Sequence, residues 1–71
     1  MNSVRKRSVT IRGHRTSYSL EDAFQQALEK IAAERPTPLA ALIAEIDEGR
    51  PRDTNLSSAL RLFVLDAVRK G

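Results

Sequence analysis

The stretch that decides the fold is residues 8–13, Ser-Val-Thr-Ile-Arg-Gly. Polar and apolar residues alternate through its first five positions, which is the period of a half-buried β-strand, and Gly13 ends the run. Because side chains alternate along a strand, Val9 and Ile11 share one face while the polar residues share the other. The stretch therefore predicts a strand over 8–12, with one face suited to a core and the other to a polar partner.

No other segment shows the alternation of a strand, and residues 14–19 are predicted to form a connecting loop. A single strand leaves its backbone donors and acceptors unpaired, which is costly and promotes aggregation. We therefore expect the strand over 8–12 to pair with a copy of itself or with another chain.

Three helices are predicted after the loop, over 20–34, 38–48 and 56–69, because apolar residues recur in each at helical spacing. Pro36 ends the first helix, and the run Gly49-Arg50-Pro51 ends the second. The third helix carries apolar residues beside its main stripe, so we expect it to be buried on more than one side. The expected helix caps are Ser19, Thr37 and Asn55, with Ser57 as the alternative to Asn55.

The length of 71 residues allows one small domain, which we assign to 1–71 as a whole. The chain has no cysteine to form a disulfide, and small domains without such a link often complete their core by oligomerising. Neither a membrane-length apolar run nor a signal-peptide pattern is present, so we expect a cytoplasmic protein that does not contact a membrane. No nucleophile–base pair, glycine-rich phosphate loop or metal-ligand spacing occurs, so we expect no enzymatic activity, no metal and no cofactor.

Basic residues are concentrated at the N-terminal end. Residues 1–16 contain five basic residues and His14 but no acidic residue. Such a segment indicates contact with a polyanion, and a solvated tail that aids solubility is the alternative. Beside a strand with a polar face, the run Arg5-Lys6-Arg7 within a basic arm over 1–7 favours contact with phosphate groups.

The basic run, the strand and two short helices separated by a tight turn resemble the ribbon-helix-helix family of MetJ/Arc-type DNA-binding proteins. The resemblance covers roughly residues 5–48 and includes Leu39-Ala40-Ala41-Leu42-Ile43 at the start of the second helix. With residues 53–70, the chain looks like a bacterial variant that carries a C-terminal extension. The resemblance implies a mostly α fold: one N-terminal strand that pairs across an intertwined dimer, two helices, and a third C-terminal helix.

The family lays its paired strands in the major groove, so the resemblance implies base contacts by the polar strand residues Ser8, Thr10 and Arg12. It also implies a phosphate site at the amino end of the second helix, where free N–H groups bind anions. Pro38 has no N–H, which moves this site to the amides of Leu39 and Ala40. The implied phosphate contacts are Arg5, Lys6, Arg7, His14, Arg15, Thr37, Leu39 and Ala40. The implied dimer core consists of Val9, Ile11, Phe24, Leu28, Ile31, Leu42, Ile43 and Ile46.

Two functions of different classes follow. The first is sequence-specific binding of double-stranded DNA by a homodimer, or by a higher assembly of dimers, that acts as a transcriptional repressor at a roughly palindromic operator. The alternative is a dimeric protein-interaction module or antitoxin-like protein that docks a partner through its C-terminal helix. Because residues 53–70 are apolar and well capped, we expect them to belong to the dimer core.

Overall fold

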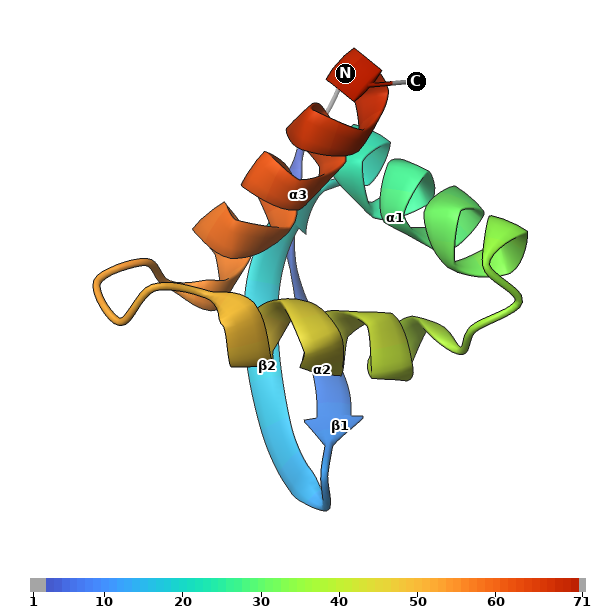
Figure 1. Cartoon of the computed structure of the whole chain (residues 1–71). Helices are drawn as coiled ribbons and strands as arrows, with labels where there is room; N and C mark the ends of the chain where they lie inside the picture. Colours follow the sequence, from blue (N-terminus) through green and yellow to red (C-terminus); the bar gives the residue numbers. More distant parts are fainter. Residues whose placement is uncertain (1–2, 71) are drawn as a thin grey trace.

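The computed structural model describes residues 3–70 as two strands followed by three helices (Figure 1). The elements are β1 (Val4–Ile11), β2 (His14–Glu21), α1 (Asp22–Glu34), α2 (Leu39–Gly49) and α3 (Leu56–Lys70). This order confirms the predicted class, a ribbon followed by two helices and a further C-terminal helix. None of the helices in the described part of the chain has both the length and the apolar character needed to cross a membrane.

The prediction of a loop over 14–19 is wrong, because these residues belong to β2. The two strands pair antiparallel in one sheet, with Val4 opposite Glu21 and Ile11 opposite His14. The serines of β2 resemble loop residues, but they occupy the face of the strand that needs no apolar side chain. The strand predicted over 8–12 therefore finds a partner within the same chain, along one of its two edges.

Arg12 and Gly13 form the turn between the strands. Their φ angles are 52° and 80°. Positive φ at both central residues is the requirement of a type I′ turn, whose twist matches that of the flanking strands. β1 therefore ends at Ile11, and Arg12 does not continue the row of polar strand residues that the sequence predicted for it.

Replacing Gly13 by alanine is expected to lower the free energy of unfolding by about 1–2 kcal/mol, because a Cβ disfavours left-handed backbone. No atom lies within 4 Å of the position that this Cβ would take, so the cost is conformational rather than steric. Gly49→Ala is the matched control, since Gly49 is helical and equally uncrowded. Urea unfolding of both variants measures the difference. Equal midpoints for the two would contradict the type I′ turn.

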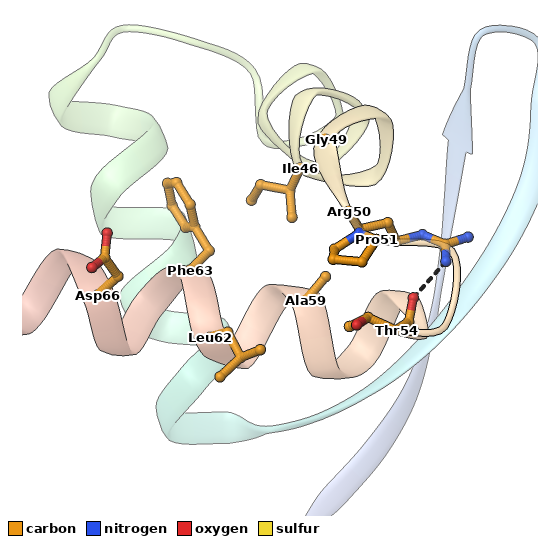
Figure 2. Close-up of a pocket in the computed structure, with 9 residues that line it drawn as sticks. All are labelled: Ile46, Gly49, Arg50, Pro51, Thr54, Ala59, Leu62, Phe63 and Asp66. Carbon is orange, nitrogen blue, oxygen red and sulfur yellow. Dashed lines mark hydrogen bonds between the residues drawn. The ribbon is translucent and has the colours of Figure 1, made fainter.

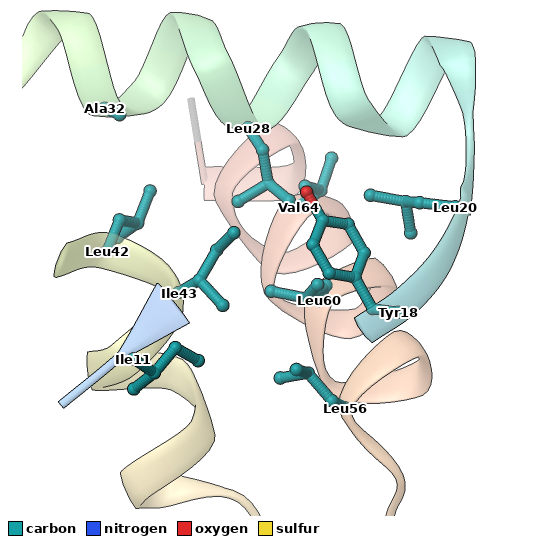
Figure 3. Close-up of a cluster of buried hydrophobic side chains, with 10 residues drawn as sticks. All are labelled: Ile11, Tyr18, Leu20, Leu28, Ala32, Leu42, Ile43, Leu56, Leu60 and Val64. Carbon is teal, nitrogen blue, oxygen red and sulfur yellow. The ribbon is translucent and has the colours of Figure 1, made fainter. Parts of the chain in front are cut away.

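The core lies between the hairpin and the three helices (Figure 3). Leu20, Leu28, Leu42, Ile43 and Leu60 are fully buried, so every helix and the second strand contribute to it. The sequence assigned eight residues to a core shared by a dimer, and all eight lie in or against this core of a single chain. Ile11, Leu28, Leu42 and Ile43 are buried, whereas Val9, Phe24, Ile31 and Ile46 are partly buried and pack around them.

Two further expectations about the helices are wrong. α1 and α2 begin without a side-chain cap, because Ser19 belongs to β2 and the Thr37 hydroxyl donates to the Arg35 carbonyl oxygen (3.1 Å). α3 is capped as predicted, since Asn55 Oδ1 accepts the Ser58 N–H at 2.8 Å. The helix is not buried on several sides, however, because the second group of apolar residues faces outward. These residues are Leu62, Leu65 and Val68.

Candidate nucleic-acid interface

The face of the hairpin that points away from the described helices is polar and basic. We call it the outer face, and it consists of Lys6, Ser8, Thr10, Arg15 and Ser17, all of them exposed. Residues directly opposite each other in paired strands point to the same side. Ser8 therefore lies beside Ser17, and Thr10 beside Arg15. Two of the three predicted base-contacting residues, Ser8 and Thr10, thus share one open surface.

The charges of the hairpin are divided between its faces. Arg5 and Arg7 both form ion pairs with Asp22, at 3.3 and 2.7 Å. Lys6 and Arg15 form no ion pair with any residue between 3 and 70. The outer face therefore carries the two cations of the hairpin that no described carboxylate neutralises.

The predicted basic arm over 1–7 belongs to β1 from Val4 onward, and residues 1 and 2 lie outside the described residues. Arg5 stands opposite Leu20, and Arg7 opposite the buried Tyr18, so both arginines share the helix-bearing side of the sheet. The Arg7 Nε is buried with no hydrogen-bond partner among the described residues. These two side chains hold β1 against the start of α1 instead of extending from a free arm.

An open hollow of about 260 Å³ lies at the tip of the hairpin. It brings together Arg12, His14 and Arg15, three residues for which the sequence predicted DNA contacts. Arg12 also pairs with Glu48 at 2.8 Å, and both side chains are more than half exposed. An exposed pair of this kind contributes about 0–1 kcal/mol, so it holds Arg12 only weakly. The carboxylate of Asp47 also lines the hollow.

The amino end of α2 does not join the outer face. Leu39 and Ala40 are partly buried, and α2 packs on the helix-bearing side, where Leu42 and Ile43 meet Ile11 in the core. Thr37, Leu39 and Ala40 therefore lie on the other side of the sheet from Ser8 and Thr10.

α3 closes part of the free edge of β2. The Ser57 hydroxyl accepts the Ser19 N–H at 2.9 Å. Arg61 donates from Nε to Glu21 Oε1 at 2.9 Å and from Nη2 to the Ser19 carbonyl oxygen at 3.4 Å. The Arg61 guanidinium holds the pKa of Glu21 below its usual value, so the pair persists into mildly acidic solution. The sequence did not reveal this contact, because it assigned Ser19 to a loop.

A chain of polar side chains, buried at its Tyr18 end and exposed at Glu29, ties β2 to α1. The Tyr18 hydroxyl donates to Gln25 Oε1 at 2.8 Å, and Gln25 Nε2 donates to Glu29 Oε2 at 3.0 Å. Burial raises the pKa of Tyr18 above its usual value of 10.0. The hydroxyl therefore stays protonated at neutral pH and keeps donating, which holds the hairpin at one orientation relative to the helices.

No cluster of three or more His, Asp or Glu side chains that could hold a metal ion occurs among residues 3–70. The hairpin is a ribbon with one face held by helices and the other open and cationic.

A family model described as "Ribbon-helix-helix domain" matches residues 4–68. No curated protein and no solved structure matches the chain. The matched range runs from the first residue of β1 almost to the end of α3. The chain therefore belongs to the ribbon-helix-helix family of DNA-binding domains.

Proposed function

We propose that the chain binds double-stranded DNA by placing the outer face of its hairpin in the major groove. The observation that carries this proposal is a two-stranded ribbon whose helix-free face is open, polar and cationic. The major groove is about 12 Å wide and accepts a two-stranded ribbon. The family match supports the same class of ligand.

Each residue of the outer face has a chemical role in this proposal. Lys6 and Arg15, which have no ion-pair partner among the described residues, contact phosphate groups. The hydroxyls of Ser8, Thr10 and Ser17 hydrogen-bond to base edges. Ser17 takes the base-facing place that the sequence assigned to Arg12, because Arg12 lies in the turn.

The tip residues Arg12 and His14 contact the DNA backbone beside the ribbon. We further propose that the protein acts as a homodimer at an operator with two-fold symmetry and represses transcription by occupying it.

Selection of bound sites from random duplexes tests the proposal, with Thr10→Val as the main variant. The loss of one base-directed hydroxyl is expected to cost about 1 kcal/mol, or about 5-fold, in affinity for the selected site. Affinity for random-sequence DNA stays unchanged, since a base contact adds nothing there. Thr16→Val is the control, because Thr16 stands on the helix-bearing face of β2. Equal selectivity for both variants would rule out base reading by Thr10.

A second candidate function is the docking of another protein on α3. The exposed apolar residues on the outer side of this helix favour it. With this function, the outer side of α3 stays exposed until the other protein binds.

A further inference from the structure

Among residues 3–70, one ion pair links the turn of the hairpin to the helices. Arg12 Nη2 lies 2.8 Å from Glu48 Oε1, and the two side chains are 52% and 65% exposed. Glu48 is the penultimate residue of α2, and the turn projects beyond this helix (Figure 1). In the free protein, the Arg12 guanidinium is therefore directed back toward a carboxylate of its own chain.

The neighbouring carboxylate of Asp47 has a partner of its own. Arg50 donates from Nε to Asp47 Oδ1 at 2.7 Å. It also donates from Nη1 to the Thr54 carbonyl oxygen at 2.6 Å, the bond drawn in Figure 2. These two acceptors fix the Arg50 guanidinium at the end of α2. Glu48 forms no ion pair with a described residue other than Arg12, so Arg12 is the one described cation that Glu48 neutralises.

A carboxylate and a DNA phosphate offer the same chemistry to a guanidinium, because both are anionic oxygen acceptors that arginine binds through its N–H groups. Both side chains of the pair are largely in solvent. Such a pair is worth at most about 5-fold in an equilibrium constant. A phosphate contact contributes about the same factor near physiological salt. The two acceptors are therefore closely matched in strength, which allows one to replace the other.

We propose that Glu48 competes with DNA phosphate for Arg12: its carboxylate holds the guanidinium in the free protein and releases it to the DNA backbone on binding. This inference rests on the proposed function, in which Arg12 contacts the backbone beside the ribbon. Because a phosphate contact carries no sequence information, the competition lowers the affinity for every duplex alike. Glu48 therefore limits how tightly the chain holds DNA of any sequence and leaves discrimination to the outer face.

The affinity for a duplex of random sequence, measured by fluorescence anisotropy, tests the competition. Glu48→Gln keeps the size of the side chain and removes its charge. It is expected to raise the affinity by about 2- to 5-fold, the range of exposed ion pairs. In the Arg12→Ala background the same substitution gives little or no gain, because no guanidinium remains to be released. Equal gains in the two backgrounds would show that Glu48 only repels the DNA, and would overturn the proposal.

The salt dependence of the same titrations distinguishes an exchange of partners from permanent pairing. If Arg12 moves to a phosphate group in the wild type, Glu48→Gln binds with the same number of phosphate contacts. The slope of log affinity against log salt then stays unchanged. If Arg12 remains on Glu48 in the wild-type complex, the variant gains a contact and its slope becomes more negative by about 0.9. That second result would overturn the exchange.

Glu45→Gln is the matched control, because it removes the same charge from the same helix. Glu45 is exposed and forms no ion pair with any described residue, so its substitution is expected to leave the affinity unchanged. A wild-type chain that binds no DNA overturns the proposed function, and this inference with it. A wild-type chain that binds DNA with an affinity that Glu48→Gln does not raise overturns this inference alone.

Discussion

Leu60→Ala is expected to lower the free energy of unfolding by about 2–5 kcal/mol, the usual cost of truncating a buried leucine. Leu60 is fully buried and brings α3 into the cluster formed with both strands and the other helices. A domain of 71 residues has a total stability of about 4–10 kcal/mol, at roughly 0.05–0.15 kcal/mol per residue. The substitution therefore removes a large part of the stability, and urea unfolding followed by circular dichroism measures the loss.

Leu62→Ala is the matched control, because it makes the same chemical change two positions along the same helix at a side chain that is 59% exposed. In dilute solution its effect stays within about 0.5 kcal/mol, as for other surface changes. Because the core is complete within one chain, the midpoint of wild-type unfolding in dilute solution does not depend on protein concentration. Two results would instead show that the core forms only between chains. One is an equal loss of unfolding free energy in the two variants, and the other is a midpoint that rises with protein concentration over the whole range.

Removing the charges of Lys6 and Arg15 together is expected to give the largest loss of DNA affinity. Each phosphate contact contributes about 0.9 to the slope of log affinity against log salt, which corresponds to about 5-fold in affinity near physiological salt. The double variant Lys6→Ala/Arg15→Ala therefore binds about 25-fold more weakly, with a slope less negative by about 1.8. Fluorescence anisotropy titrations at several salt concentrations measure both quantities.

Two controls separate local contact from net charge. Lys30→Ala removes one positive charge from an exposed position on α1, and it leaves the slope unchanged. Arg5→Ala changes the residue next to Lys6 in the sequence. The Arg5 guanidinium pairs with Asp22 on the opposite side of the sheet from Lys6. This variant also leaves the slope unchanged if the outer face is the contact surface. A slope that falls equally for all of these variants would show that only overall charge attracts the DNA.

The helices were predictable because apolar residues recur along them at a period that depends on neighbouring residues alone. Each lies within two residues of its predicted bounds. β2 was missed for a physical reason: Tyr18 and Leu20 carry its inner face, but the residues that alternate with them, Ser17 and Ser19, have the composition of a turn. Its strand state depends on pairing with β1, and that pairing is not local.

The residues of the candidate site were predictable only where the evidence was local in the sequence. Alternation places Ser8 and Thr10 on one polar face, and both are exposed there. Charge singled out Lys6 and Arg15, but it did not distinguish them from Arg5 and Arg7. Only Asp22 makes that distinction, and it meets the two arginines because the hairpin returns β2 to the start of α1.

The sequence by itself determined the three helices, the two-faced character of the first strand and the excess of positive charge around it, because periodicity and composition are properties of neighbouring residues. The tertiary structure alone decided which strand pairs with β1, which cations remain unneutralised and which side of α3 is left open. Each of these depends on groups far apart in the chain, such as Arg61 and Ser19, whose contact exists only after the chain has folded.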